Sequence, residues 1–253
     1  MTSKASCKKK PLLLSSNRGL SEMQKHTVLL SGGIDSTTAL YWARNRDKRT
    51  TAITFDYGQK NRVEIQAARK ITARLEIPQT ILQVDLGQIG GSPLTDPSLS
   101  LPRMESITQI QEGLPETYVP FRNGIFLALA AAWAETQEIS GIVCGFNVID
   151  SPNYPDTRES FVKAMEKAIN SGTGAAFGRK RITILAPFLN LSKSAIIKQG
   201  MALGADYSFS ISCYRDSEIP CLRCSSCLLR QKAWEEAGMK DPLIVRLEKE
   251  GKL

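Results

Sequence analysis

Short apolar runs alternate with longer stretches of helical periodicity along most of this chain. The apolar runs are rich in residues that favour strands and lie at 26–30, 50–56, 79–86, 140–145 and 182–186. Helical patterns lie between or after them, at 36–46, 60–75, 122–138, 157–170 and 192–203. This alternation predicts an α/β fold built on a doubly wound parallel sheet with right-handed crossovers.

The remaining positions are less regular. Residues 87–119 form the one long irregular stretch of the sequence, and a loop of this length in a compact domain typically covers an active site. In doubly wound sheets the active site lies beyond the carboxyl ends of the strands. We therefore expect the functional side chains to follow predicted strands or to open predicted helices.

The sequence Ser31-Gly32-Gly33-Ile34-Asp35-Ser36 follows the first predicted strand and opens a helix. The first N–H groups of a helix have no partner within the helix, and the helix dipole makes this end positive. The two glycines let the backbone turn sharply and approach an anion. The pattern is typical of a loop that binds nucleotide phosphates, although it is neither a Walker loop nor a dinucleotide loop.

Asp35 is the unusual member of this loop, because a carboxylate beside phosphates is repulsive unless a cation bridges them. We therefore predict Mg²⁺ together with ATP at this site. An ordinary turn, in which Asp35 or Ser36 caps the helix, is the alternative interpretation. The predicted ATP-binding set is Leu30, Ser31, Gly32, Gly33, Ile34, Asp35, Ser36, Thr37, Thr38, Ala39 and Leu40.

Four of the six cysteines are clustered towards the C-terminus. A disulfide framework is disfavoured because no secretory signal is recognisable, and a redox pair would leave two thiols without a function. A closed tetrahedral Zn²⁺ site uses all four thiolates and has no open coordination position, so that the metal would be structural. The predicted ligands are Cys213, Cys221, Cys224 and Cys227, and a helical pattern follows at Ser225–Ala237.

Composition and charge limit the remaining possibilities. Hydrophobic residues make up 42% of the 253 residues, enough for a full core, and no apolar run is long enough to span a membrane. The net charge is +8, but six basic side chains and one acidic side chain in residues 1–25 account for +5 and leave +3 for the rest. We therefore expect no direct nucleic-acid partner, no membrane partner and a cytoplasmic location.

These observations divide the chain into three parts. Residues 1–24 are expected to be a disordered basic tail, because most of the excess positive charge lies in this terminal segment. Residues 25–206 are predicted to form the ATP-binding α/β domain. Residues 207–253 are predicted to form a small helical segment that carries the zinc.

Further polar residues lie where the fold rule expects them. Tyr57 and Gln59 follow the second predicted strand, and Arg122 and Asn123 open a predicted helix. A cation such as Arg122 at a helix start opposes the dipole, so it should hold an anion. Lys193 lies at another helix start. The loop after the strand at 140–145 adds Asn147, Asp150, Tyr154, Asp156 and Arg158. Each of these residues also has an ordinary explanation, as a helix cap or part of a turn.

Taken in order, these motifs resemble two nested groups of enzymes. Residues 31–36 are similar to the pyrophosphatase-type loop of ATP enzymes that adenylate a carboxylate, amide or carbonyl oxygen. The chain from about residue 26 to residue 242 resembles the bacterial 7-cyano-7-deazaguanine synthase family. The motifs that carry this resemblance are residues 31–36, Asp56-Tyr57-Gly58-Gln59, Val119-Pro120 with Arg122-Asn123, Tyr154-Pro155-Asp156 with Arg158, Ser192-Lys193, Ser212-Cys213-Tyr214 before the cysteine triplet, and Asp241-Pro242.

The resemblance implies an adenine nucleotide alpha hydrolase-like, Rossmann-type fold and a specific reaction. Such an enzyme converts 7-carboxy-7-deazaguanine and ammonia to the nitrile 7-cyano-7-deazaguanine, a precursor of queuosine. ATP activates first the acid and then the amide. We accordingly expect a carbon–nitrogen ligase that uses ATP, Mg²⁺ and Zn²⁺, takes small-molecule substrates and forms a homodimer.

The resemblance also suggests roles for the polar residues. Asp35, Arg122 and Lys193 are the catalytic candidates, and the two cations would hold the substrate carboxylate or the developing phosphate charge. The deazaguanine needs a carboxylate acceptor for its amidine edge, for which Asp150 and Asp156 are candidates. The full substrate-binding set is Tyr57, Gln59, Asn123, Asn147, Asp150, Tyr154, Asp156 and Arg158.

The chain departs from the usual family pattern at four places. Phe121 replaces an alanine, residues 151–153 replace Tyr-Ser-Gly, Thr157 replaces a cysteine and Ile211 replaces a tryptophan. An enzyme acting on a different deazapurine acid is therefore an alternative. A second is a tRNA-modifying ATP enzyme that transfers sulfur or an amino acid, and a third is a zinc-containing module that binds nucleic acid. Sulfur transfer would need a reactive thiol outside the zinc set, and only Cys7 and Cys144 are available.

Overall fold

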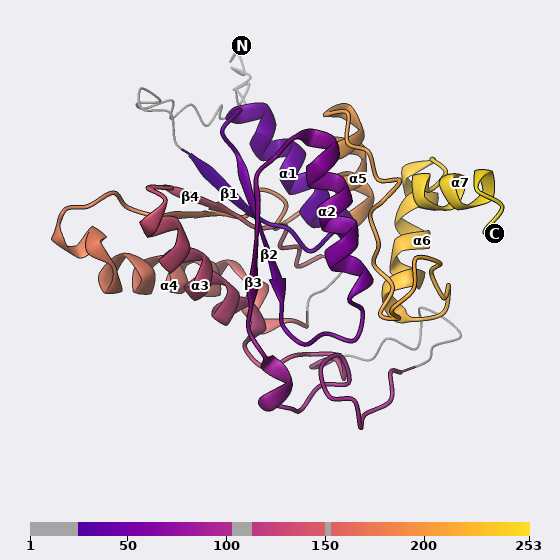
Figure 1. Ribbon diagram of the computed structural model, residues 1–253, viewed down its shortest axis with the longest axis horizontal. Helices are drawn as coiled ribbons and strands as arrows, with labels where there is room; N and C mark the ends of the chain where they lie inside the picture. The colour runs from indigo at the N-terminus through magenta and orange to yellow at the C-terminus, as the bar shows by residue number, and fades with distance from the viewer. Residues whose placement is uncertain (1–24, 103–112, 150–152) are drawn as a thin grey trace, which may run out of the picture.

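The computed structural model describes residues 25–102, 113–149 and 153–253. Its centre is a five-stranded sheet in which all neighbouring strands are parallel (Figure 1). The strand order is β3-β2-β1-β4-β5, so the chain changes direction across the sheet between β1 and β4. The strands are β1 His26–Leu29, β2 Thr51–Asp56, β3 Gln79–Gln83, β4 Gly141–Val143 and β5 Thr183–Leu185.

Helices cover both faces of the sheet (Figure 1). On one face, α3 (Arg122–Thr136) and α4 (Glu159–Gly172) pack against Ile53, Ile142 and Ile184. On the other face, α1 (Ile34–Arg46), α2 (Val63–Leu75) and α5 (Lys193–Ala202) pack against a core that includes Val28 and Val143. Neighbouring residues of a strand point to opposite faces, as Ile142 and Val143 do here. The predicted doubly wound parallel sheet is therefore confirmed.

The helix and strand boundaries differ from the predicted ones by a few residues. The third strand ends at Gln83 instead of residue 86, because the short turn Leu86–Gln88 follows, capped by the Asp85 side chain. Likewise, α4 begins at Glu159 because the turn Pro155–Thr157 precedes it. The predicted helix at Ser225–Ala237 is α6. The sequence analysis did not predict α7 (Pro242–Lys249), whose first turn is capped by Asp241.

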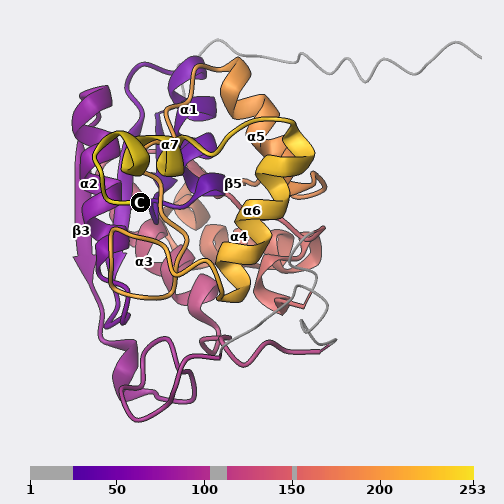
Figure 2. The same cartoon turned by 90° about the vertical axis from the view of Figure 1, so that its right-hand side faces the viewer.

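The C-terminal helix α6 packs against α5, and α7 follows it (Figure 2). Trp234 of α6 stacks edge-on against Tyr207 at a centroid distance of 5.3 Å. The Tyr207 hydroxyl in turn lies 2.6 Å from Thr38 Oγ1 in the middle of α1. The segment after residue 206 thus shares a hydrophobic core with the nucleotide-loop helix.

The parts of the irregular stretch that the structure describes lie below the carboxyl ends of the strands in the view of Figure 1. Its described parts, residues 87–102 and 113–119, contain no helix or strand beyond the turn that ends at Gln88. Leu94 from this stretch reaches the cavity described below. None of the helices in the described part of the chain is long and apolar enough to cross a membrane.

Candidate active site

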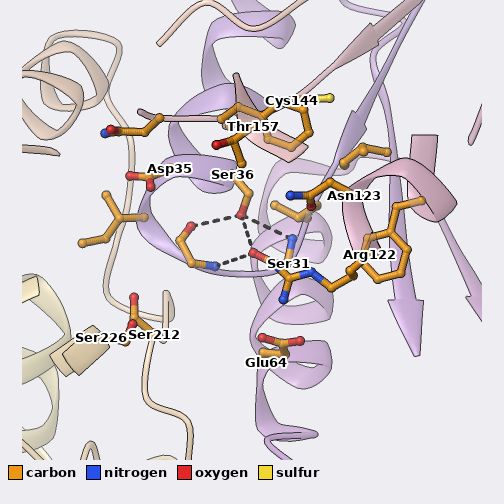
Figure 3. Close-up of a pocket in the computed structure, with 18 of the residues that line it drawn as sticks. Ser31, Asp35, Ser36, Glu64, Arg122, Asn123, Cys144, Thr157, Ser212 and Ser226 are labelled. Carbon is orange, nitrogen blue, oxygen red and sulfur yellow. Dashed lines mark hydrogen bonds between the residues drawn. The ribbon is translucent and has the colours of Figure 1, made fainter. Parts of the chain in front are cut away.

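A cavity of about 330 Å³ lies at the carboxyl ends of the strands, where the strand order reverses (Figure 3). The walls of this cavity come from segments that are far apart in the sequence. They include the phosphate loop after β1, the end of β2, the first turns of α2 and α3, and the segment after β4. The C-terminal half adds Lys193, Ile211, Ser212 and Tyr214. This position is where a doubly wound sheet binds its ligands.

The loop after β1 lines the cavity and contains N–H groups that no described residue accepts. Gly32 has φ +88°, and Gly33 is the N-cap of α1 with extended backbone. The loop is closed internally by the Ser31 and Ser36 hydroxyls, whose oxygens lie 3.1 Å apart. Among the described residues, the backbone N–H groups of Ile34, Asp35 and Ser36 have no hydrogen-bond acceptor. This geometry suits an anion at the helix start.

Asp35 and Lys193 meet at the edge of this loop. Lys193 Nζ lies 2.7 Å from Asp35 Oδ2, and Lys193 is placed by Ser192, whose side chain accepts the N–H of Ala195 at the start of α5. The second oxygen, Asp35 Oδ1, is buried and has no hydrogen-bond partner in the described part of the structure. A carboxylate with one unsatisfied oxygen beside a phosphate site can accept a cation.

The phosphate loop packs closely against the segment after β4 and against α2. A Cβ atom added to Gly145, the second residue after β4, would lie 2.7 Å from the Asp35 carbonyl carbon. A Cβ atom added to Gly32 would lie 2.7 Å from the backbone oxygen of Glu64 on α2. The chain therefore needs glycine at both positions for the loop to sit where it does. Gly145 is not among the predicted site residues, although a glycine at the end of an apolar run can indicate a close approach of two backbone segments.

Arg122 at the start of α3 supplies an uncompensated positive charge. Among the described residues its guanidinium has one hydrogen bond, a long one of 3.5 Å to the Tyr57 hydroxyl, and no carboxylate oxygen lies within 4.0 Å. Phe121 before it has φ 52°, and the Asp156 side chain accepts the N–H of Asn123 at 3.0 Å. The helix start is thus capped by an acid while the guanidinium points into the cavity (Figure 3).

Glu64 lies in the first turn of α2 and lines the same cavity, although it is absent from the predicted site residues. Gln59 donates to one of its carboxylate oxygens at 2.9 Å, and Asn61 donates to the other at 3.0 Å. Burial raises the pKa of Glu64 to about 7, opposed by the charge of Arg122 and by these two amide hydrogen bonds. Its position in the first turn of the helix that follows Gln59 and Asn61 was the signal available in the sequence.

The structure brings together part of the predicted ATP-binding set. Six of its residues line the cavity, namely Leu30, Ser31, Gly33, Ile34, Asp35 and Ser36. Gly32 supports the loop from behind. The side chains of the last four residues of the set are fully buried and face the core instead of the cavity: Thr37, Thr38, Ala39 and Leu40. The reason is that α1 leads away from the cavity after Ser36, and Ala39 and Leu40 belong to the hydrophobic core.

The predicted substrate-binding set is divided in the same way. Four of its residues line the cavity, namely Tyr57, Asn123, Asn147 and Tyr154. Gln59 and Asp156 are buried behind the wall, where they orient Glu64 and cap α3 respectively. Arg158 is exposed at the start of α4. Asp150 lies outside the described residues.

Aromatic side chains form one wall of the cavity. Phe126 stacks on Phe55 with ring centroids 4.0 Å apart, and Tyr57 packs edge-on against the same ring. Of the positions that depart from the family pattern, Thr157 and Ile211 line the cavity and Phe121 does not, while residues 151–152 lie outside the described part. Such a wall suits a planar heterocycle.

Cys144 also lines the cavity, at the end of β4, but its side chain is fully buried. Burial raises the pKa of the Cys144 thiol, so the thiolate that a sulfur-transfer reaction would need is disfavoured. Cys7, the other candidate thiol, lies outside the described residues. The structure therefore gives a sulfur-transfer role no support.

The four clustered cysteines form a site that can hold a metal ion. The sulfur atoms of Cys213, Cys221, Cys224 and Cys227 all lie within 4.8 Å of one another. Cys213 Sγ accepts the N–H groups of Arg215 and Cys221, each at 3.4 Å, and hydrogen bonds from Cys224 and Cys227 lower its pKa. Sulfur atoms that share one tetrahedral ion at about 2.3 Å are compatible with these separations.

Replacement of Cys224 by serine is expected to remove the metal and to lower stability by about 3 kcal/mol or more, because the remaining thiolates cannot close a tetrahedron. For a chain of this size, such a loss lowers the thermal midpoint by about 10 °C. Metal content by plasma mass spectrometry and calorimetry on the same samples test this. Cys144→Ala is the control and should keep the metal; equal metal in both variants would contradict the site.

The metal site and the phosphate loop are linked through one short segment. The N–H of Ile211 donates to the Gly32 carbonyl at 2.9 Å, and Ser212 lines the cavity beside the loop. Cys213 follows directly, and its carbonyl accepts a hydrogen bond from Asn61 at 3.3 Å. The cysteine cluster therefore fixes the backbone that forms one side of the candidate active site.

Comparisons with known proteins identify the family of this chain. Residues 25–238 match the family model of the queuosine biosynthesis protein QueC. A 7-cyano-7-deazaguanine synthase of Cellvibrio japonicus is 42% identical over 223 residues, covering 87% of this chain and 96% of the relative. One from Solidesulfovibrio magneticus is 44% identical over 227 residues, covering 88% and 96%. A solved 4-thiouridine synthetase–RNA complex with bound ATP is 18% identical with a TM-score of 0.49, covering 89% of this chain and 53% of that chain. The chain belongs to the family of the queuosine biosynthesis protein QueC.

Proposed function

We propose that this protein is a carbon–nitrogen ligase that converts 7-carboxy-7-deazaguanine and ammonia to 7-cyano-7-deazaguanine at the expense of ATP. The observation that carries the proposal is the presence of two anion sites in one cavity. The phosphate loop offers free N–H groups, and Arg122 offers a guanidinium without a carboxylate partner among the described residues. The related synthases named above support the choice of substrate.

The chemistry requires both sites. A carboxylate is a poor electrophile because its negative charge repels nucleophiles. Transfer of one of its oxygens to an ATP phosphorus gives a mixed anhydride whose acyl carbon ammonia can attack. Arg122 would hold the acid against the phosphate loop, so that the two anions can approach each other in spite of their charges. The same groups would serve the second activation, in which the amide oxygen is transferred and the nitrile is formed.

Asp35 and Lys193 complete the phosphate side of the proposed site. Asp35 Oδ1 is buried without a hydrogen-bond partner among the described residues and is the atom that would hold Mg²⁺, which neutralises phosphate charge when it is bound. Lys193 would contact the phosphates from the opposite side of the Asp35 carboxylate. For the deazaguanine we propose the aromatic wall together with Asn123, Asn147 and Tyr154.

The remaining expectations are part of the same proposal. The metal of the cysteine site is Zn²⁺ with a structural role, and residues 207–253 form the segment that it stabilises around the loop. The α/β layers of residues 25–206 bind ATP. We further propose that the enzyme is a cytoplasmic homodimer that acts on the free base and makes no direct contact with RNA.

Incubation of the protein with ATP, Mg²⁺, ammonium and 7-carboxy-7-deazaguanine is expected to yield the nitrile. The product would be identified by mass spectrometry, and ATP consumption would depend on the acid. Unchanged acid together with intact ATP would contradict the proposal. Omission of the acid is the matched control, because background ATP hydrolysis would otherwise be counted as turnover.

A further inference from the structure

Glu64 has no role in the reaction as described so far, yet its carboxylate lies beside the phosphate loop. It lines the cavity, and its backbone oxygen is the atom against which Gly32 packs. Figure 3 shows the carboxylate pointing into the space next to Ser31 and Arg122. Arg122 lines the same cavity, so the two side chains border one space.

Neutral amides hold this carboxylate in a fixed orientation. The Gln59 amide that donates to Glu64 also donates to the Phe55 carbonyl at 3.1 Å, and its oxygen accepts the N–H of Tyr57 at 2.7 Å. Asn61 is fixed by its hydrogen bond to the Cys213 carbonyl. Within the described part of the chain, no lysine, arginine or histidine nitrogen lies within 4.0 Å of the Glu64 carboxylate. The charge is therefore oriented but not neutralised.

We propose that Glu64 binds the ammonium ion and takes a proton from its nitrogen as the carbon–nitrogen bond forms, an inference that rests on the proposed function. Each carboxylate oxygen uses one acceptor position on an amide and keeps another for a donor in the cavity. A small monovalent cation with N–H donors fits this need. Arg122 holds the acid from α3 and Glu64 delivers the amine from α2, so the two reactants approach from different walls.

The proposed step balances in protons and electrons. Ammonium gives one proton to the Glu64 carboxylate, and the freed nitrogen lone pair attacks the acyl carbon of the mixed anhydride. The bond from this carbon to the bridging oxygen breaks, and the phosphate departs with its electron pair and with the second proton that nitrogen loses. The products are the amide, the protonated phosphate group and neutral Glu64, which returns its proton to water. A carboxyl group with a pKa of about 7 is suited to both transfers at neutral pH.

The two halves of the reaction provide the test, because only the first half uses ammonia. Glu64→Gln and the wild-type enzyme would each be given ATP with either the acid plus ammonium or the ready-made carboxamide. General-base catalysis contributes about 10²- to 10⁴-fold, so the variant should lose at least about 100-fold from the acid. From the carboxamide it should keep its rate within about tenfold. Hydroxylamine, which is largely unprotonated at pH 7, should partly replace ammonium in the variant.

Several outcomes would overturn the inference. An equal loss from acid and carboxamide would show that Glu64 binds the deazaguanine, since both substrates carry it. Loss of acid-dependent ATP consumption would place Glu64 in the activation step, and a raised Mg²⁺ requirement would make it a metal ligand. A wild-type enzyme inactive with both substrates would instead refute the proposed function itself.

Two further variants serve as controls for the Glu64→Gln result. Glu64→Asp keeps a carboxylate and should retain more of the ammonium-dependent rate than Glu64→Gln, with the carboxamide rate again as internal reference. If Glu64→Gln does not fold, this ratio in Glu64→Asp decides the question. Glu76→Gln changes an exposed acid at the end of the same helix, α2, and should leave both rates unchanged.

Discussion

Replacing Gly32 with alanine is expected to lower kcat/KM for ATP by about 10²- to 10³-fold and stability by about 1–3 kcal/mol. Gly32 has φ +88°, a conformation that side chains rarely adopt, and a Cβ there would lie 2.7 Å from the Glu64 backbone oxygen and 3.0 Å from the Ala68 nitrogen. Both atoms belong to the backbone of α2 and cannot rotate away. The loop must therefore move, and its N–H groups move with it.

The neighbouring glycine is a matched control for stability. Gly33 has φ −81°, and the nearest atom to a Cβ there would be 3.6 Å away. Gly33→Ala should therefore unfold at the wild-type temperature, as measured by calorimetry, while Gly32→Ala unfolds earlier. Gly172→Ala, at the end of α4 and with no atom near its added Cβ, should keep both stability and activity. If Gly32→Ala behaved like Gly172→Ala, the loop would not depend on the contact with α2.

The parallel sheet could be predicted because its signal is repeated along the sequence. Strands that are buried on both faces give continuous apolar runs, and the helices between them show the helical spacing of apolar residues. The strands β4 and β5, of three residues each, were still located, since the pattern depends on burial and not on length. The helix α7 was missed although its buried residues Leu243 and Leu247 have helical spacing, because it has only eight residues and its start depends on Asp241 being held by α6.

The parts of the candidate site that a single short sequence motif forms could be predicted. The phosphate loop and the cysteine cluster are local, so their spacing alone suggested what they could bind. Asp156 shows the limit of this approach. A carboxylate after a strand can face a ligand or cap a helix, and only the packing of α3 against residues 155–157 decides that it caps Asn123. The position of Glu64 after Gln59 is visible in the sequence, but its role is not, since that role depends on amides that Tyr57 and Cys213 orient.

Arg230→Met is the second change with a large expected effect, a loss of about 3–5 kcal/mol in the free energy of unfolding. Arg230 is 4% exposed, and its guanidinium contacts both oxygens of Asp241, at 2.5 and 2.8 Å. The substitution keeps an unbranched apolar stem but leaves the Asp241 carboxylate, which also caps α7, without the Arg230 guanidinium as its positive partner. Urea unfolding with an unchanged m-value would measure the loss.

A double-mutant cycle separates the ion pair from the packing. Arg230→Met combined with Asp241→Asn should be less destabilised than the sum of the single changes, by about 1–3 kcal/mol, because the second change removes the unpaired charge. Additive losses would mean that the contact between the two charges contributes nothing of its own.

The same arginine should affect the nucleotide site from a distance. It donates to Ser210 at 3.1 Å and to Ser212 at 3.4 Å, on either side of the residue whose N–H binds the Gly32 carbonyl. Loss of these bonds frees the segment that holds the phosphate loop, so Arg230→Met should raise the KM for ATP at temperatures where the protein remains folded. An unchanged KM in the folded variant would show that the cysteine cluster and α2 position the loop without help from α6.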